Sequence, residues 1–179
     1  VVVTGSNVEI YYSSESGFEE YLLGDHQFDI EIVDIDADGD NDVVGLKWQM
    51  GESSITIYEN TGISEFIEHE LQSFEPPSSK FITSNLNNDF LIDIIVLPST
   101  LDGFYIFYNN GCCILNEPVF FPVVYFNEGD RNAASADLDG NGYNDIVIVR
   151  YLHAQLPANV TILFNDGKGN FVEEPIANV

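Results

Sequence analysis

The chain consists of short runs of β-branched and aromatic residues, separated by turns that are rich in Asp, Asn and Gly. Residues 28–33, 55–58, 104–108 and 160–164 are examples of these runs. Their length, their composition and the turn residues that bound them are typical of β-strands. The pattern therefore predicts an all-β protein.

One segment departs from this pattern. In residues 64–74 the apolar side chains Phe66, Ile67, Leu71 and Phe74 lie near helical spacing. The segment nevertheless stands where the third strand of a repeating unit is expected, because it follows an Asn- and Gly-containing turn. We therefore predict a strand here as well.

A nine-residue stretch rich in Asp and Asn occurs three times, as DIDADGDND, NLNNDFLID and DLDGNGYND. These first, second and third loops begin at positions 34, 85 and 137, so the copies are 51 and 52 residues apart. A constant period of this size indicates a repeat architecture, in which each repeat is one supersecondary unit.

Each loop is followed by two strand-like runs, an Asn- and Gly-rich turn, a further strand and a last strand that leads into the next loop. Four short antiparallel strands per unit are typical of a β-propeller blade. We predict a single repeat domain of nearly four blades. The approximate blades are residues 1–25 (incomplete, three strands), 26–76, 77–128 and 129–179.

The strand and loop that would precede Val1 in a complete first blade are not in the sequence. We therefore expect the chain to be part of a larger or multi-chain propeller, or to close as a small ring or with another copy. Closure leaves few exposed strand edges.

The loops carry oxygen-bearing side chains at every second position, as calcium sites do. Carboxylates at positions 1, 3, 5 and 9 and a backbone carbonyl at position 7 can converge on one ion, and a Gly at position 6 permits the turn. The predicted ligands are Asp34, Asp36, Asp38, Asp40 (carbonyl) and Asp42 in the first loop, and Asp137, Asp139, Asn141, Tyr143 (carbonyl) and Asp145 in the third.

The spacing begins like that of an EF-hand, which also needs a Glu at position 12 and flanking helices. Position 12 is Gly45 in the first loop and Ile148 in the third, and the flanking runs are strand-like. The EF-hand interpretation therefore fails on both counts.

The second loop departs from the pattern, because neutral Asn residues replace two acids and Phe90 stands at the turn position. Neutral ligands attract a cation less strongly, and Phe resists the positive φ that Gly tolerates. We predict calcium in the first and third loops, in that order of affinity, and weaker metal binding, if any, in the second. The weaker ligands are Asn85, Asn87, Asp89, Leu91 (carbonyl) and Asp93.

A D-x-D-x-D/N-G-x-x-D loop followed by an apolar strand, at this period, resembles the FG-GAP/VCBS repeats. These are the calcium-loop blades of integrin α-subunit propellers and of many secreted bacterial proteins. The turn at residues 165–171 is also similar to the turn between blade strands in that family. The resemblance implies a secreted or cell-surface protein whose ligands bind on a face assembled from several blades.

The composition limits the possible partners. Thirty acidic and five basic residues give a net charge of −25, which argues against nucleic acids and anionic membrane surfaces. No apolar run is long enough to cross a bilayer, so direct membrane insertion is not expected. Repulsion between the loop carboxylates predicts that calcium stabilises the protein.

Other chemistry has little support in the sequence. His26, His69 and His153 show no metal-ligand spacing and no evident Ser or Cys partner, so we interpret them as surface or packing residues. Cys112 and Cys113 are adjacent, which is compatible with a vicinal disulfide or with two thiols. No catalytic constellation is found, and we do not predict an enzyme.

The preferred hypothesis is a calcium-stabilised extracellular module with a binding or adhesion role, toward a protein or glycan ligand. One alternative is a carbohydrate-binding or carbohydrate-active propeller, because paired carboxylates and aromatic residues are abundant. Another is a structural unit that self-associates into a ring or a surface fibre. Fold-level resemblance alone does not decide among them.

Overall fold

A computed structural model describes the chain except for residues 1, 5–6, 15–16, 26, 63–64, 72, 76–77, 99–100, 112, 124–129, 152–158 and 177–179. The described residues form fifteen β-strands and no helix, so the all-β prediction is confirmed. No described segment is a helix with the length and apolar character needed to span a bilayer.

The strands form four antiparallel sheets, in each of which consecutive strands of the chain are hydrogen-bonded neighbours. The first sheet contains β1 (Val2–Thr4), β2 (Asn7–Ser14) and β3 (Gly17–Asp25). The second contains β4 (Gln27–Val33), β5 (Asp42–Gln49), β6 (Glu52–Asn60) and β7 (Phe66–Glu70). The third contains β8 (Ser78–Ser84), β9 (Asp93–Pro98), β10 (Gly103–Phe107) and β11 (Val119–Pro122). The fourth contains β12 (Asp130–Ala136), β13 (Asp145–Tyr151), β14 (Asn159–Asn165) and β15 (Phe171–Ile176).

Residues Phe66–Glu70 of the segment with near-helical apolar spacing form a strand, as predicted, whereas Leu71 and Phe74 lie beyond it. β7 pairs antiparallel with β6, so that Phe66 lies opposite Asn60 and His69 opposite Ile57. Phe66 and His69 are partly buried, whereas Ile67 is exposed. Pairing with β6 satisfies the backbone groups of this segment and overrides its apolar spacing.

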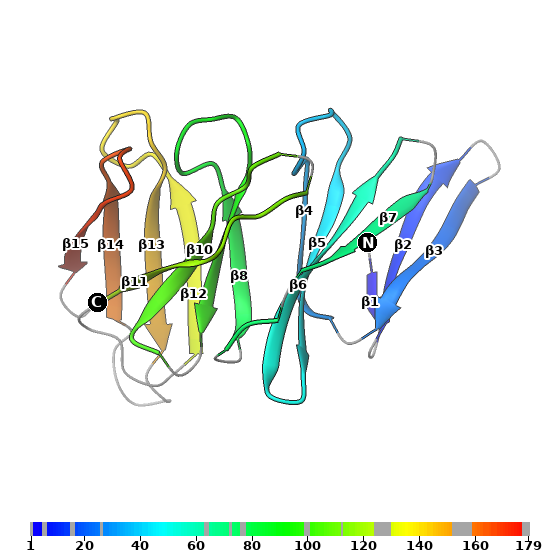
Figure 1. Ribbon diagram of the computed structural model, residues 1–179, viewed down its shortest axis with the longest axis horizontal. Coiled ribbons are helices and arrows are strands. Elements are labelled where there is room, and N and C mark those ends of the chain that lie inside the picture. Colours follow the sequence, from blue (N-terminus) through cyan, green and yellow to red (C-terminus); the bar gives the residue numbers. More distant parts are fainter. Residues whose placement is uncertain are drawn as a thin grey trace.

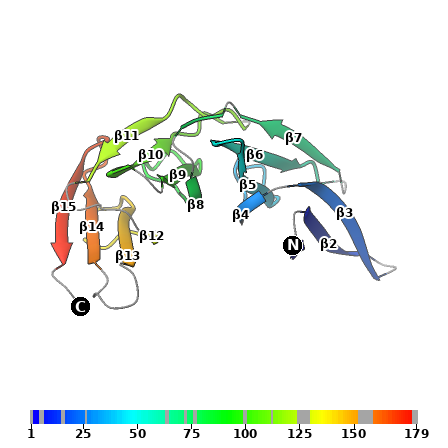
Figure 2. The same ribbon diagram turned by 90° about the horizontal axis from the view of Figure 1, so that it is seen from below.

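The four sheets stand side by side (Figure 1) and follow an arc when seen along their length (Figure 2). The first strand of each four-stranded sheet (β4, β8 or β12) lies on the inside of this arc, and the last strand (β7, β11 or β15) lies on the outside. On the inside, β8 contacts both β4 and β12.

The third sheet is covered on both faces, and β9 shows how the sequence produces this. Ile94 and Val96 pack in the core toward the second sheet, whereas Ile95 and Leu97 pack in the core toward the fourth. Successive side chains of a strand point to opposite faces, so a strand with two apolar neighbours needs a continuous apolar run. All six residues of β9 are buried.

Aromatic rings extend this packing between the sheets. Phe104 in the third sheet lies edge-on to Phe171 in the fourth, with ring centroids 5.9 Å apart, and Phe121 lies 5.2 Å from the same ring. On the other face, Phe74 lies 5.2 Å from Phe107. Each fully buried apolar side chain contributes about 1.5–3 kcal/mol, so face-to-face packing holds the sheets in their arc.

Candidate metal centres

The three acidic loops occupy equivalent places in the fold. Each connects the first and second strands of a four-stranded sheet, and position 9 of each loop is the first residue of the second strand. All three loops lie along the same edge of the row of sheets, the upper edge in Figure 1. The repeat therefore places three similar groups of polar side chains on one rim of the arc.

The loops share one backbone conformation. Positions 4 and 6 have positive φ in every copy: Ala37 (63°) and Gly39 (99°), Asn88 (60°) and Phe90 (71°), Gly140 (78°) and Gly142 (90°). The second loop thus adopts the turn despite Phe90, whose side chain is 84% exposed. Phe90 thus takes the positive φ that a non-glycine residue is expected to resist, at a cost of about 1–2 kcal/mol.

In the first loop, Asp34, Asp36 and Asp42 each place one carboxylate oxygen within 4.8 Å of the others. The two oxygens of Asp34 accept hydrogen bonds from the backbone N–H groups of Asp38 and Gly39, each at 3.1 Å. These bonds hold the first ligand position in place. Burial, together with the neighbouring charges of Asp38, Glu59 and Asp34, raises the pKa of Asp36.

Two other predicted ligands of the first loop lie outside this group of three carboxylates. Asp38 accepts a hydrogen bond from the backbone N–H of Asp40 at 2.8 Å. The Asp40 side chain lies against Gly62, where an added Cβ would approach its Oδ2 to 2.6 Å. The structure therefore brings together positions 1, 3 and 9 of the loop, with position 5 bonded within the turn.

The third loop repeats this arrangement. Asp137, Asp139 and Asp145 also place one oxygen each within 4.8 Å of one another. Asn141 accepts a hydrogen bond from the backbone N–H of Tyr143 at 2.8 Å and donates one to the carbonyl of Asn165 at 2.8 Å. Its side chain is thus tied to the turn that follows β14.

The second loop has a weaker donor set. Asn87 donates a hydrogen bond to Asp89 at 2.8 Å, and Leu91 donates its backbone N–H to the same carboxylate at 2.9 Å. The Oδ1 atom of Asn85, at the first ligand position, is buried and has no hydrogen-bond partner among the described residues. A cation or a water molecule at this position would satisfy that oxygen.

Position 9 has a structural role that the sequence analysis missed. Asp42, Asp93 and Asp145 are fully buried. In each copy, one carboxylate oxygen accepts a hydrogen bond from the backbone N–H of loop position 2, at 2.8–3.0 Å. The other oxygen accepts a hydrogen bond from the backbone N–H of an Asn, at 2.8–2.9 Å. This Asn lies at the end of the sheet's third strand or just beyond it. The carboxylate therefore closes the loop and joins it to the next turn.

Burial disfavours the ionised forms of Asp42 and Asp93. It raises the pKa of Asp42, although the hydrogen bonds from Asn60 and Ile35 oppose the shift. It raises the pKa of Asp93 to about 6, against the bonds from Asn109 and Leu86. Desolvation disfavours the ionised form, so a bound cation would offset a cost that these sites carry without one.

The Asn residues bonded to position 9 form a second repeated feature. Asn109 donates its side-chain N–H to the carbonyl of Ile35 in the preceding sheet at 2.6 Å, and Asn165 donates to the carbonyl of Leu86 at 2.7 Å. Both side chains are buried. The sequence shows these residues only as the Asn of an Asn-x-Gly turn, which gives no sign of a bond between sheets.

The Gly of each Asn-x-Gly turn accommodates position 7 of the neighbouring loop. An added Cβ at Gly167 would collide with the ring of Tyr143, and Gly167 has a φ of 69°. Gly62 lies against Asp40 in the same way. The side chains at position 7 therefore pack on this turn, and the predicted role of position 7 as a ligand rests on its backbone carbonyl.

The structure places two polar side chains beside His69, which is partly buried. Its Nε2 atom lies 2.7 Å from Oε2 of Glu59, and Cys113 lies close to both. The sequence shows no sign of this contact, because Cys113 is far from His69 in the chain and lies in the connection between β10 and β11 of the third sheet. His26, His153 and Cys112 lie outside the described residues, and so does any bond between Cys112 and Cys113.

The donor sets of the first and third loops fit a hard divalent cation. They contain only oxygen atoms, three of them from carboxylates that converge, and calcium prefers six to eight such ligands in irregular geometry. No protein-family profile matches the chain, and no curated protein matches it.

Proposed function

We propose that this chain is a calcium-binding β-propeller module of an extracellular protein, with a binding or adhesion role and with calcium as a structural ion. The proposal rests on one observation. Two loops at equivalent places in the second and fourth sheets each bring three carboxylate oxygens within 4.8 Å of one another. Groups of like charge at such separations repel, and a divalent cation offsets this repulsion.

The arrangement of the sheets supports a propeller. Four-stranded antiparallel sheets that pack face to face, with their first strands on the inside of an arc, are the arrangement of propeller blades. The loops resemble those of FG-GAP/VCBS repeats, and we propose membership of that family on this basis. The arc would then be completed by further blades or by another copy of the chain.

Calcium in these loops would make the rim rigid. The described hydrogen bonds already fix the loop backbone through positions 1 and 9, so the ion would complete a turn that is largely formed. A preformed site binds with little loss of conformational entropy. We assign the ion no catalytic step.

Calcium titration tests this proposal. The thermal midpoint is measured in chelator, in Ca²⁺ and in Mg²⁺, and isothermal calorimetry counts the sites. We expect two calcium sites and a higher midpoint in Ca²⁺, with about 2.7 kcal/mol of added stability per site at one hundred times the dissociation constant. Mg²⁺ demands more regular geometry and should have a smaller effect.

Matched variants assign the sites. Asp36→Asn and Asp139→Asn should each remove one calcium site and part of the shift in midpoint, because each takes a carboxylate from one group of three. Asp89→Asn is the control, since its loop has no such group among the described residues. An identical midpoint in chelator and in calcium would refute the proposal, as would equal effects of all three variants.

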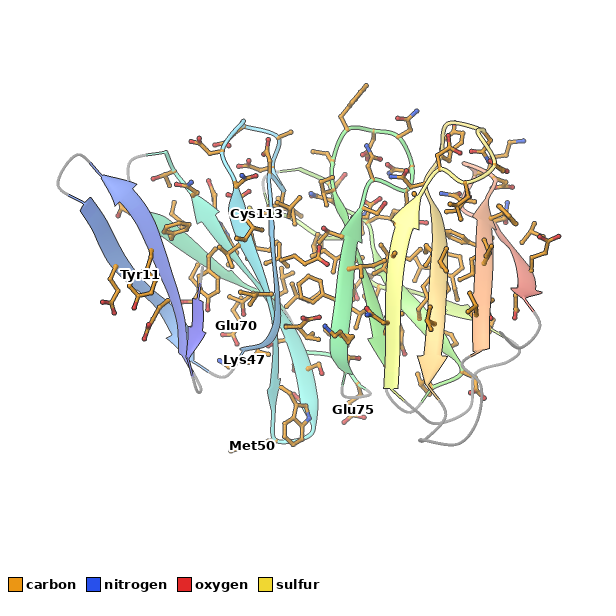
Figure 3. All side chains as sticks on the ribbon, turned by 180° about the vertical axis from the view of Figure 1, so that it is seen from behind. Tyr11, Lys47, Met50, Glu70, Glu75 and Cys113 are labelled. Carbon is orange, nitrogen blue, oxygen red and sulfur yellow. The ribbon has the colours of Figure 1, made fainter. Side chains whose placement is uncertain are left out.

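A glycan ligand is the second candidate. Trp48, near the turn between β5 and β6, is 43% exposed, and an exposed aromatic ring can stack on a sugar face. Met50 lies at the tip of that turn, at the opposite end of the sheets from Cys113 (Figure 3). A glycan array with the native protein and with Trp48→Ala tests this candidate. The native protein should bind a glycan, and the variant should lose that binding.

A further inference from the structure

A cluster of a different chemical kind lies between the second and third sheets. Glu59 of β6, His69 of β7 and Cys113 of the β10–β11 connection each place one potential ligand atom within 4.8 Å of the others. We propose that these three side chains form a second type of metal site, which takes a zinc-like divalent ion and links the two sheets.

The strand register brings the first two ligands together. His69 pairs with Ile57, and Glu59 lies two residues further along β6, so the two side chains are diagonal neighbours on one face of the sheet. Their atoms Nε2 and Oε2 are 2.7 Å apart. The His–Glu pair is therefore positioned by the β6–β7 ladder.

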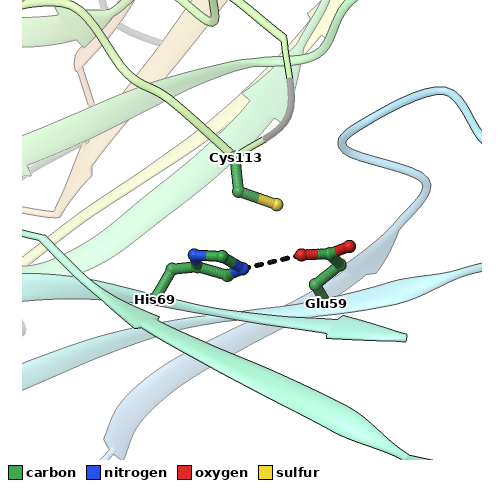
Figure 4. A group of neighbouring side chains, drawn as sticks. All are labelled: Glu59, His69 and Cys113. Carbon is green, nitrogen blue, oxygen red and sulfur yellow. Dashed lines mark hydrogen bonds and ion pairs between the residues drawn. The ribbon is translucent and has the colours of Figure 1, made fainter. Parts of the chain in front are cut away.

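The third ligand comes from the neighbouring sheet. Cys113 is 4% exposed and belongs to the core cluster that joins the second and third sheets. Figure 4 shows its thiol pointing toward the His–Glu pair. Three ligand side chains thus converge from two sheets, and a shared ion would cross-link them.

The donor chemistry distinguishes this site from the loops. Thiolate, imidazole and carboxylate are the ligands of zinc, whereas calcium prefers oxygen alone. The side chains of His69 and Glu59 are 34% and 26% exposed, so an ion can reach them from solvent. Binding would release the thiol proton to solvent, and three protein ligands would leave a fourth position for water.

A thiol nucleophile is a less suitable explanation for the same residues. In a nucleophile–base–carboxylate chain, the imidazole uses one nitrogen for the nucleophile and the other for the carboxylate. Here Nε2 bonds Glu59, and Figure 4 shows the Cys113 sulfur on the side of that same nitrogen. Three potential ligand atoms within 4.8 Å of one another can instead share one metal ion.

Cobalt provides a spectroscopic test, because Co²⁺ bound to a thiolate gives a charge-transfer absorption that carboxylate sites do not. The full chain is reduced, freed of metal and titrated with Co²⁺, and Zn²⁺ is then added. We expect one equivalent of Co²⁺ to produce this absorption and Zn²⁺ to abolish it. Asp36→Asn, which alters the first calcium loop, should leave the absorption unchanged.

Ligand variants complete the test. Cys113→Ser should abolish the absorption, and His69→Gln should weaken affinity at least about tenfold, a loss seen even for residues that only support a ligand. Cys112→Ser is the matched control and should retain the thiolate absorption. Circular dichroism checks the fold of each variant. The proposal fails if the native chain gives no thiolate absorption, if the absorption survives Cys113→Ser, or if Cys112→Ser removes it.

Discussion

The buried carboxyl group of Asp93 predicts an unusual dependence of stability on pH. Burial raises its pKa from 3.8 to about 6, with a smaller contribution from the charge of Asp89. Between these pH values the native protein retains a proton that the unfolded chain has lost. The free energy of unfolding of the metal-free protein should therefore fall as the pH rises through this interval.

The variant Asp93→Asn isolates this effect, because the amide has the shape of the carboxyl group and carries no charge. A shift of about two pKa units corresponds to about 3 kcal/mol, or about 2–3 kcal/mol after allowance for solvent screening. Relative to the variant, the native protein should lose this amount of stability between about pH 4 and about pH 8.

Urea unfolding in the presence of chelator, monitored by fluorescence at a series of pH values, measures both proteins under the same conditions. Asn87→Ser, which changes a neutral exposed residue of the same loop, should retain the pH dependence of the native protein. A difference in the free energy of unfolding between the native protein and Asp93→Asn that stays constant with pH would refute this reasoning. A gain in stability of the native protein relative to the variant as the pH rises would refute it as well.

Three further predictions concern the loops and turns. Phe90→Gly should raise the free energy of unfolding by about 0.5–1 kcal/mol in urea denaturation, since relief of positive-φ strain exceeds the entropy cost of Gly; unchanged stability would contradict this. Asn109→Ala should lower the free energy of unfolding by about 2–4 kcal/mol, because three hydrogen bonds of the Asn109 side chain are lost. Asn110→Ala, at an exposed position, should have little effect on it. Gly167→Ala should lower the thermal midpoint more than Gly169→Ala, since both have positive φ but only the first would collide with the tyrosine ring at loop position 7; equal shifts would exclude that contact.

Much of the fold can be predicted from local pattern. The β-branched runs and their turns predict the strands, and the spacing of the acidic loops predicts the grouping into four-stranded sheets. The continuous apolar run of β9 indicates burial on both faces, since alternating polarity would leave one face in water. Even the strand Phe66–Glu70, within a segment of near-helical apolar spacing, could be assigned from its place in the repeat.

The details of the site depend on contacts that no local pattern shows. The spacing of Asp42 predicts a ligand, but its bond to the backbone N–H of Asn60 depends on the position of the next turn. Asn109 bonds a carbonyl in another sheet. The cluster of Glu59, His69 and Cys113 requires two sheets to pack face to face. Contacts between segments that are distant in the sequence decide each of these cases.

The two hydrogen bonds that the position-9 carboxylate accepts have a consequence for how such a protein can evolve. The second loop has Asn at positions 1 and 3, where the other two loops have Asp, yet it has the same pattern of φ as its neighbours, and Asp93 still accepts both N–H groups. The scaffold of the loop is thus separable from its ligands. Substitution can therefore change the acidic side chains of one loop at a time, while the architecture of the other repeats is preserved.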